Sequence, residues 1–320
     1  MIPPLDLSRP LAAALAAARA ADQLLRRSLS EREPLLVDTK GRHDFVTQVD
    51  RRSEALIAGM LRAACPEIGL LGEEGSGLDL DADFLWVVDP LDGTSNFIHG
   101  YPAFAVSIGL VERRKMMVSS EMDGAAKRES DSSSDSLFPT SSTPPDTVAA
   151  RYPQVLGRRP VLGVIADVCQ RRLYSGWQGG GAWRAALPED PLAPLGAPER
   201  LRVGQTTTLD EAFVATGFPI RHKDLARLYL NVFDALMPPS AGIRRGGSAA
   251  LDLAYTAAGV FDAFVELNLA PWDMAAGLCL VREAGGAAAG LGGDILANGH
   301  LVAGNPKLVK EICRRLAGRL

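Results

Sequence analysis

Apolar residues recur with helical spacing near the start of the chain. The segment LAAALAAARAADQLLRRSL is rich in alanine and leucine, which predicts a helix over residues 11–29. A second helix is predicted from about Thr47 to Ala64. Thr47 can cap its N-terminus, Asp50 lies in its first turn, and Pro66 stops it.

Shorter apolar runs predict buried strands. They occupy residues 68–71, 84–88, 104–111, 161–168 and 172–175. From residue 211 onward helices and strands are expected to alternate. The expected helices are 222–236, 248–258, 273–284 and 306–317, and the expected strands are 243–245, 261–267, 287–289 and 301–303. Because such alternation is typical of a compact α/β unit, we expect an N-terminal α+β domain (residues 1–205) and a C-terminal α/β domain (206–320).

One segment, about residues 116–153, does not share this pattern. Residues 130–142 alone hold seven serines, and four prolines punctuate the segment. Such a composition can bury little surface, so we expect a disordered Ser/Pro-rich loop inserted between two strands. A phosphorylated regulatory loop is the alternative interpretation.

The composition is that of an ordinary globular protein. The chain has 320 residues and a mass of 34.0 kDa; 47% of the residues are hydrophobic and 22% are charged. These values exclude a mostly disordered chain. Asp and Glu outnumber Lys and Arg by 38 to 34, which gives a formal charge of −4. A bulk electrostatic attraction to nucleic acid is therefore not expected.

The four cysteines are scattered and form no CxxC pair, which excludes a zinc ribbon and argues against a disulfide framework. We therefore expect reduced thiols in a cytoplasmic protein. The N-terminal segment MIPPLDLSRP lacks the basic region of a secretory signal. The longest uncharged run, residues 93–111, is interrupted by Asn, His, Gly and Pro, so no membrane span and no membrane partner are expected.

The segment WVVDPLDGTSNF carries the strongest chemical signal. An apolar strand delivers Asp89 at its end, and the following proline starts a turn whose ends, Asp89 and Asp92, lie within ~7 Å. Gly93 permits an unusual backbone angle, and Thr94 begins a short helix whose N–H groups suit a phosphate. Two carboxylates ~4 Å apart repel by ~4 kcal/mol at an effective dielectric constant of about 20. One must therefore hold a proton, or a cation must lie between them.

Three further segments place acids at the end of a strand or the start of a helix. LLGEEG supplies Glu73, PWDMAAG places Asp273 at the cap or in the first turn of a helix, and KGRHDFVTQVD holds Lys40 and Asp50. Each segment alone is explained by a solvated loop or by helix capping. Together, four acidic segments that hold no Cys and a single His, His43, which shows no ligand spacing, predict a site for a hard cation, Mg²⁺ or Mn²⁺. A phosphate-ready helix start beside them favours phosphoryl transfer with two metal ions ~3.5–4 Å apart.

The joint pattern GEE, DPLDGTSNF, GSAALDLAY and PWDMAAG, in this order, resembles the inositol monophosphatase family of Mg²⁺-dependent, lithium-sensitive phosphatases. The resemblance covers almost the whole chain outside the 116–153 insertion. It implies a phosphoric monoester hydrolase with the layered α/β/α/β/α sandwich of the inositol monophosphatase and fructose-1,6-bisphosphatase type, usually a homodimer. The N-terminal domain would carry most of the metal ligands, and the C-terminal domain would complete the active site.

The resemblance also implies a metal-binding role for each matched acid. Glu73, Asp89 and the backbone carbonyl of Leu91 would hold the activating Mg²⁺. Asp89, Asp92 and Asp273 would hold a second ion that stabilises the leaving oxygen. A third, weaker ion would lie near Glu73, and Mn²⁺ could replace Mg²⁺.

The catalytic assignments follow from the same resemblance. Thr94, paired with Asp50, would orient the attacking water, and the N–H groups of Gly93 and Thr94 would hold the phosphate. Lys40 would belong to a mobile loop beside the metals. The reaction would be a direct in-line attack by a metal-activated water, because a bound metal can lower the pKa of water from about 15.7 toward 7.

The substrate side resembles the family's sugar-binding loop. Asp92 would contact a substrate hydroxyl, and Glu266 matches the acid that contacts inositol hydroxyls, with an exposed strand-end acid as the alternative. The loop residues are Gly247, Ser248 and Ala249. Arg244 and Arg245 would contact either the substrate or a second copy of the chain.

The sequence SNF after DGT resembles the inositol phosphatase branch. The expected reaction is the hydrolysis of a small polyol phosphate, inositol 1-phosphate, to inositol and phosphate. A fructose-1,6-bisphosphatase, a 3′-phosphoadenosine 5′-phosphate phosphatase and a histidinol-phosphate phosphatase are the enzymatic alternatives. A binding or scaffold role in a transcription complex is the alternative from another class, because some family relatives have such a role.

Overall fold

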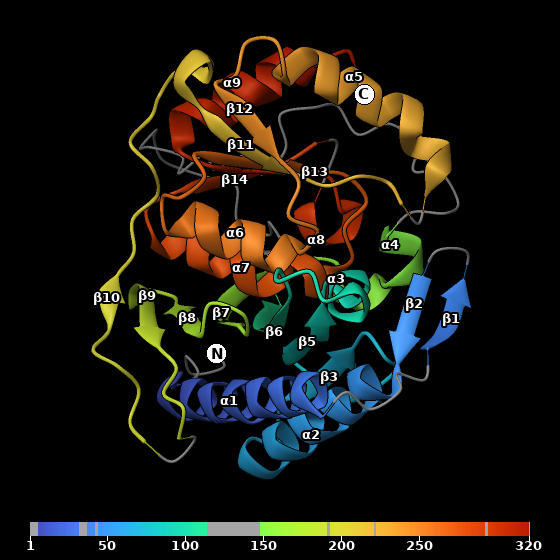
Figure 1. Ribbon diagram of the computed structural model, residues 1–320, viewed down its shortest axis with the longest axis vertical. Coiled ribbons are helices and arrows are strands. Elements are labelled where there is room, and N and C mark those ends of the chain that lie inside the picture. Colours follow the sequence, from blue (N-terminus) through green and yellow to red (C-terminus); the bar gives the residue numbers. More distant parts are fainter. Residues whose placement is uncertain are drawn as a thin grey trace, which may run out of the picture.

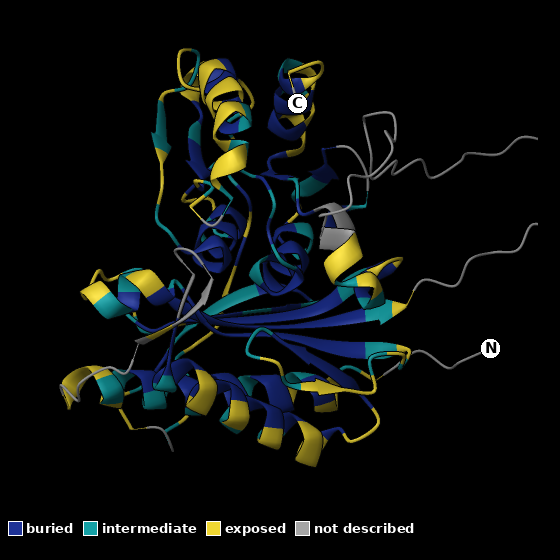
Figure 2. Ribbon diagram, turned by 90° about the vertical axis from the view of Figure 1, so that its right-hand side faces the viewer, coloured by how far each residue is buried: buried dark blue, intermediate teal, exposed yellow. Residues whose placement is uncertain are grey.

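The structure, a computed structural model, describes residues 6–31, 37–41, 44–113, 148–190, 193–220, 222–291 and 294–319. Its elements stack in five layers, in which helices alternate with two sheets (Figure 1). Apolar clusters fill the space around the middle helices and beneath both outer helical layers. Figure 2 shows that buried residues fill the sheets and exposed ones lie on the outer helices. The layered sandwich predicted from the sequence is confirmed.

Helices α1 (Ser8–Ser30) and α2 (Gln48–Ala64) form the outer layer at the bottom of Figure 1. Leu25 of α1 and Ile57 of α2 are fully buried in the core with Trp86 of the larger sheet. The face of α1 in this core consists of small side chains, which let the helix lie close to the strands. They are Ala14, Ala17, Ala18 and Ala21. Both helices confirm the sequence prediction.

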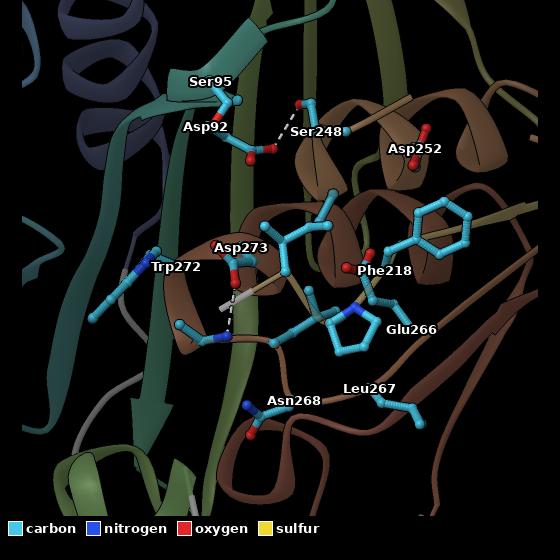
Figure 3. Close-up of a pocket in the computed structure, with 18 of the residues that line it drawn as sticks. Asp92, Ser95, Phe218, Ser248, Asp252, Glu266, Leu267, Asn268, Trp272 and Asp273 are labelled. Carbon is cyan, nitrogen blue, oxygen red and sulfur yellow. Dashed lines mark hydrogen bonds between the residues drawn. The ribbon is translucent and has the colours of Figure 1, made fainter. Parts of the chain in front are cut away.

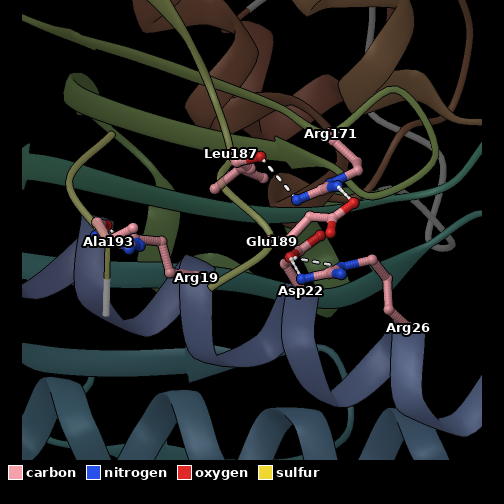
Figure 4. Close-up of polar contacts among 7 residues, drawn as sticks. All are labelled: Arg19, Asp22, Arg26, Arg171, Leu187, Glu189 and Ala193. Carbon is pink, nitrogen blue, oxygen red and sulfur yellow. Dashed lines mark hydrogen bonds and ion pairs between the residues drawn. The ribbon is translucent and has the colours of Figure 1, made fainter. Parts of the chain in front are cut away.

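A hydrogen bond links α1 to the segment that contains Ala193, and other polar contacts lie nearby (Figure 4). Arg19 donates a hydrogen bond of 2.6 Å to the carbonyl of Ala193, and Arg26 donates one of 3.0 Å to Oδ2 of Asp22. Arg171 donates to the carbonyl of Leu187 at 3.0 Å. Asp22 is 2% exposed, and its Oδ1 atom has no hydrogen-bond partner among the described residues. Burial therefore raises the pKa of Asp22 above its usual 3.8, although the charges of Arg26 and Arg171 oppose the shift.

The larger sheet has the strand order β10-β9-β8-β7-β6-β5-β3-β4. β3 runs parallel to β5, and the other neighbours are antiparallel. Helices cover both faces, which explains why the central strands are continuously apolar. The strands are β3 (Gly69–Gly72), β4 (Gly77–Leu78), β5 (Phe84–Asp92), β6 (Ala105–Arg113), β7 (Arg158–Asp167), β8 (Arg172–Trp177), β9 (Gly181–Ala186) and β10 (Glu199–Arg200). The five runs predicted as strands are confirmed.

A two-stranded hairpin precedes α2. Strands β1 (Val37–Gly41) and β2 (Asp44–Thr47) pair antiparallel. Lys40 therefore lies in a strand, and the expectation that it belongs to a loop is wrong. Its side chain lies outside the described part of the structure. The sequence offered no alternation that would have predicted these short strands.

Helices α6 (Ala249–Ala257) and α7 (Pro271–Glu283) lie between the two sheets. α7 lies directly on the larger sheet, where β6 and β7 offer it glycines. A β-carbon at Gly163 would lie only 2.2 Å from the carbonyl oxygen of Ala276. No other residue type fits there, so this strand and α7 approach each other without an intervening side chain.

The smaller sheet has the strand order β12-β11-β13-β15-β14, with β11 parallel to β12 and β13. Helices α5 (Ala226–Leu236) and α9 (Pro306–Leu316) cover its outer face. The strands are β11 (Phe213–Thr216), β12 (Gly242–Arg244), β13 (Ala263–Glu266), β14 (Ala287–Gly290) and β15 (Leu301–Gly304). The predicted alternation from residue 211 onward is confirmed, except that β11 and a short helix at Ile295–Asn298 were missed. The division into domains at residue 205 stays a prediction.

The predicted disordered insertion is wrong at its C-terminal end. Helix α4 (Val148–Arg151) and the 3₁₀ turn η1 (Pro153–Val155) lie at that end of it. The fully buried Val155 anchors η1 in the core, and the ring of Tyr152 packs against Trp272. Residues 114–147, which hold the serine-rich part, lie outside the described residues. The flanking strands β6 and β7 pair antiparallel.

Short helices complete the described chain. They are α3 (Thr94–His99), α8 (Ile295–Asn298), η2 (Leu209–Glu211) and η3 (Lys223–Leu225). Among the described helices, none combines the length and the apolar character that crossing a membrane would require.

Candidate active site

The end of β5 carries a bulge rather than the predicted turn. Asp89 pairs with Ser107 of β6, and Asp92 pairs with Ala105, so β5 has one residue more than its neighbour over this stretch. Proline at position 90 has no N–H for the ladder, which favours an irregularity here. The N–H of Leu91 donates to Oδ1 of Asp89 at 3.0 Å. The bulge thereby places two acids three residues apart at one end of a buried strand.

Three carboxylates converge beside this bulge. One oxygen each of Asp89, Asp92 and Asp273 lie within 4.8 Å of one another. Asp273 lies in the first turn of α7, and its Oδ2 accepts a hydrogen bond of 2.7 Å from the N–H of Ala270. Asp273 therefore caps its helix and also belongs to the acid cluster. These three acids are the set to which the family resemblance assigns the second metal ion.

Asp89 is deeply buried within this cluster, and its charged form is unfavourable. It is 1% exposed, and its Oδ2 atom has no hydrogen-bond partner among the described residues. Burial, together with the negative charges of Glu73, Asp92 and Asp273, raises the pKa of Asp89 well above its usual 3.8. A buried carboxylate oxygen without a donor is costly unless a proton or a cation satisfies it. The donor atoms are all oxygens, which suits Mg²⁺ or Mn²⁺.

Glu73 lies directly after β3, where its N–H donates to the carbonyl of Val88 at 3.1 Å. It is not one of the three mutually close acids, but it lines the same pocket and its charge acts on Asp89. Glu54 of α2, which the sequence analysis did not single out, fixes this loop. Its carboxylate is 2% exposed and accepts from the N–H groups of Glu74 at 2.7 Å and Ser76 at 2.8 Å. An acid on the inner face of the predicted helix was the available signal.

The predicted pairing of Thr94 with Asp50 is present. The Thr94 hydroxyl lies 3.0 Å from Oδ1 of Asp50 and 3.1 Å from the carbonyl of Leu91, and donates toward both. Oδ2 of Asp50 accepts from the N–H of Thr47 at 2.9 Å and from its hydroxyl at 2.5 Å. Burial raises the pKa of Asp50, whereas these hydrogen bonds oppose the shift. The capping box at the start of α2 therefore also holds Thr94 in place.

Gly93 has the unusual backbone angle that the sequence predicted, with φ of 94°. A β-carbon there would also lie 2.9 Å from the carbonyl oxygen of Ala103. Glycine is therefore required at the start of α3. Ser53 of α2, missed in the sequence analysis, supports the same region because its hydroxyl donates to the carbonyl of Pro90 at 3.0 Å.

The expected sugar-side loop faces the acid cluster from α6. Ser248 caps this helix, and its hydroxyl donates to Oδ2 of Asp92 at 2.6 Å. The N–H of Ala250 donates to the same oxygen at 2.7 Å. Asn96 of α3 donates to the carbonyl of Gly246 at 3.0 Å, so the loop is tied to both segments.

These residues surround a cavity of about 650 Å³ (Figure 3). Asp50, Asp89 and Leu91 lie buried and do not line it. Its lining includes these predicted site residues: Glu73, Asp92, Gly93, Thr94, Gly247, Ser248, Ala249, Glu266 and Asp273. The lining residues that the sequence analysis did not predict include Arg151, Tyr152, Phe218 and Asp252, and Arg245 proves to line it as well. Arg151 and Tyr152 belong to the segment that was predicted to be a disordered insertion.

The model of the inositol monophosphatase family matches residues 6–121 and 155–318 of this chain. The chain belongs to the inositol monophosphatase family. This membership makes it a phosphatase, a phosphoric monoester hydrolase. The family model leaves out residues 122–154, so Arg151 and Tyr152 form a part of the pocket wall that the family pattern does not describe.

Similar proteins carry two kinds of name. The chain is 39% identical over 306 residues to the Nus factor SuhB of Pseudomonas aeruginosa, covering 93% of this chain and 92% of that protein. It is 36% identical over 295 residues to the inositol-1-monophosphatase of Rhizobium meliloti, covering 91% and 90% respectively.

Two solved structures share the fold. The extragenic suppressor protein suhB of Bartonella henselae has a TM-score of 0.75 at 34% identity, with 98% of this chain and 100% of that chain covered. The inositol monophosphatase of Anabaena has a TM-score of 0.70 at 28% identity, with 98% and 97% covered. The predicted α+β architecture is thus that of solved inositol monophosphatases.

Proposed function

We propose that the protein is a Mg²⁺-dependent phosphomonoesterase that hydrolyses a small polyol phosphate, inositol 1-phosphate, to inositol and phosphate. The observation that carries this proposal is the buried Oδ2 atom of Asp89, which has no donor among the described residues and belongs to a cluster of acids beside a cavity. Such an arrangement destabilises the fold unless a proton or a cation satisfies the acids, and we propose that a cation does. Because the chain belongs to a family of phosphatases, we infer that this cation would serve phosphate ester hydrolysis.

The residues fit two ions that share Asp89. Asp89, Asp92 and Asp273 would hold one, and Glu73, Asp89 and the carbonyl of Leu91 would hold the other. A third, weaker ion would lie near Glu73. The Leu91 carbonyl accepts one hydrogen bond from Thr94, so its second lone pair is available for a metal. Bound Mg²⁺ would supply an acidified water and neutralise charge on the leaving oxygen.

Thr94 and Asp50 would orient the attacking water. The single hydroxyl proton of Thr94 has two acceptors in the protein, Oδ1 of Asp50 and the carbonyl of Leu91, and is shared between them. Oγ1 of Thr94 would therefore accept a hydrogen bond from a water. A water that donates a hydrogen bond to Thr94 keeps a lone pair directed away from Thr94, where it would be available to attack the phosphate. The N–H groups of Gly93 and Thr94 at the start of α3 would hold the phosphate.

The substrate's hydroxyl groups would face Asp92, Glu266 and the loop that precedes α6, which contains Gly247, Ser248 and Ala249. Two observations support inositol 1-phosphate: the SNF sequence after DGT and the 36% identical relative named inositol-1-monophosphatase. We propose that the enzyme is a homodimer, as is usual in the family.

The test is phosphate release from a panel of substrates with Mg²⁺, with EDTA, and with Mg²⁺ plus Li⁺. The panel holds inositol 1-phosphate, fructose 1,6-bisphosphate, 3′-phosphoadenosine 5′-phosphate and histidinol phosphate. We expect Mg²⁺-dependent, Li⁺-inhibited release that is fastest from inositol 1-phosphate. Faster release from another member would replace the substrate. Release unaffected by EDTA would overturn the metal assignment.

A second function is favoured by the names of relatives, of which one 39% identical and another 34% identical are each called Nus factor SuhB. We propose that this chain also binds a component of a transcription complex, independently of catalysis. A tagged protein should copurify with the transcription machinery, and the Asp92→Asn variant should retain that binding while losing turnover. Loss of both together, in a folded variant, would contradict an independent role.

A further inference from the structure

Asp252 of α6 is a buried carboxylate that the sequence analysis did not assign to the site. It is 3% exposed and lines the cavity. No described residue donates a hydrogen bond to its carboxylate. Figure 3 shows Asp252 and Glu266 on the same side of the pocket, beside Phe218. The carboxylate oxygens of Asp252 are not among the fully buried atoms that lack a partner, so they are open to the cavity, where a bound molecule can donate hydrogen bonds to them.

Helix capping does not explain Asp252. The first turn of α6 is already served by other groups, because the N–H of Ala250 binds Asp92 and the N–H of Leu251 binds the Ser248 hydroxyl. The N–H of Asp252 itself donates to the carbonyl of Ser248. Asp252 also lies outside the group of acids close enough to share a metal ion. Its carboxylate thus has neither a capping role nor a place in the acid cluster.

The surrounding backbone leaves room for two carboxyl groups. A β-carbon at Gly217 would lie 1.7 Å from Oε1 of Glu266, and one at Gly246 would lie 2.9 Å from Oδ1 of Asp252. Glycines on two segments therefore form the space in which the acids lie. Arg245 is the cation whose charge acts on both carboxyl groups, and its guanidinium stands 5.8 Å from the ring centroid of Phe218.

We propose that Asp252 and Glu266 together form a wall that binds the hydroxyl groups of a polyol monophosphate, with Asp252 as a specificity-determining residue. This inference rests on the proposed phosphatase activity. Hydroxyl groups of the substrate supply the donors that the Asp252 carboxylate lacks. A second phosphate on the substrate would lie against the negative charges of Asp92, Asp252 and Glu266. The positive charge of Arg245 would offset this repulsion only in part, so the same wall disfavours bisphosphates.

The first experiment compares inositol 1-phosphate with p-nitrophenyl phosphate, which has no hydroxyl groups to bind the wall. In Asp252→Ala the KM for inositol 1-phosphate should rise about 10- to 100-fold, the range for one lost hydrogen bond to a charged group. The loss of kcat/KM should be at least about ten times larger for inositol 1-phosphate than for p-nitrophenyl phosphate. An equal loss on both substrates, or none on either, would overturn the inference.

Controls separate this inference from the proposed function and from misfolding. A wild-type protein that hydrolyses neither ester would contradict the phosphatase proposal itself. Asp210→Asn removes an exposed acid from the first turn of η2 and should leave the substrate ratio unchanged. If Asp252→Ala does not fold by circular dichroism, the isosteric Asp252→Asn takes its place in the same comparison.

The second experiment uses fructose 1,6-bisphosphate. Asp252→Asn removes a negative charge from the wall but keeps its shape. The ratio of kcat/KM for the bisphosphate to that for inositol 1-phosphate should rise about tenfold relative to wild type. An unchanged or lower ratio would contradict the repulsive role of Asp252.

Discussion

The hydroxyl of Ser248 donates a hydrogen bond of 2.6 Å to Asp92, 156 positions earlier in the chain. Ser248 begins α6 between the two sheets, and Asp92 ends β5 of the larger sheet. The same hydroxyl accepts from the N–H of Leu251 and so caps its helix. One side chain therefore fixes both a helix start and the direction of an acid in the proposed metal site.

Replacing Ser248 by alanine should affect stability and turnover together. The variant loses a helix cap, which costs ~1 kcal/mol of unfolding free energy, and a charge-assisted bond whose loss lowers kcat/KM about tenfold. Ser248→Thr keeps the hydroxyl and should restore most of both. Chemical denaturation and steady-state kinetics check this, with Ser30→Ala, on the exposed end of α1, as the control. Normal turnover in Ser248→Ala would show that Asp92 does not depend on this bond.

Metal binding should be visible in the melting temperature. If the acid cluster binds Mg²⁺ only in the folded state, Mg²⁺ at 100 times its Kd adds ~2.7 kcal/mol to the unfolding free energy. Asp89→Asn should weaken that response and abolish turnover. The same variant should be at least as stable as wild type in EDTA, because it removes a buried charge beside other acids.

The matched control for Asp89→Asn is Asp81→Asn, since the Asp81 side chain is 99% exposed. It should keep the full Mg²⁺ response measured by differential scanning fluorimetry. Wild-type turnover in Asp89→Asn would refute the assignment of the metal site.

Tyr152 should influence the site although it lies outside the family pattern. Its ring meets that of Trp272 edge-on at 4.8 Å between centroids, and Trp272 precedes Asp273. Such a pair contributes ~0.5–1.5 kcal/mol beyond its buried area. Tyr152→Leu should therefore lower the unfolding free energy by about 1 kcal/mol and raise KM several-fold. Tyr152→Phe keeps the ring and should behave as wild type. If Tyr152→Phe instead behaved like Tyr152→Leu, the hydroxyl group and not the edge-on ring contact would be responsible for the effect.

Asp22 should make stability depend on pH. Its pKa is raised in the folded protein, so between pH 3.8 and the folded pKa the native state binds more protons than the unfolded chain. Stability from this group is greatest at low pH and is lost as pH rises through the folded pKa. Asp22→Asn should flatten that part of the profile and raise the melting temperature most at pH 8.

The control for this titration is Asp234→Asn, whose carboxylate is 77% exposed beside Arg319. Melting curves from pH 4 to pH 8 for the three proteins give the comparison. Parallel wild-type and Asp22→Asn profiles would mean that the buried carboxylate is neutralised by Arg26 throughout.

Elements with a strong periodic pattern could be predicted from the sequence. The alanine-rich face of α1 and the apolar runs of β5, β6 and β7 are stable only where they are buried, and they share one apolar core. β1 and β2 could not be predicted, because strands of five and four residues carry no clear alternation. The bulge at the end of β5 depends on pairing with β6, which is a tertiary contact.

The residues of the candidate site likewise fall into those that could be predicted from the sequence and those that could not. Acids at strand ends and helix starts, such as Asp89 and Asp273, could be predicted because their local position already suggests convergence. Asp252 and Tyr152 could not, since their surroundings come from segments far away in the chain. For Glu54 the available signal was its place on the inner face of a predicted helix, which did not show what its carboxylate binds. Tyr152 was moreover hidden in a serine-rich segment whose composition favoured disorder.

The contact between Gly163 and Ala276 has a consequence for how this pocket can change during evolution. Helix α7 lies on the sheet without clearance, so the chain has no freedom to shift Asp273 relative to the end of β5. Variation that leaves the acids in place can therefore fall on the part of the pocket wall that α4 and Tyr152 build. Substrate preference can then diverge among relatives while the acids stay where they are.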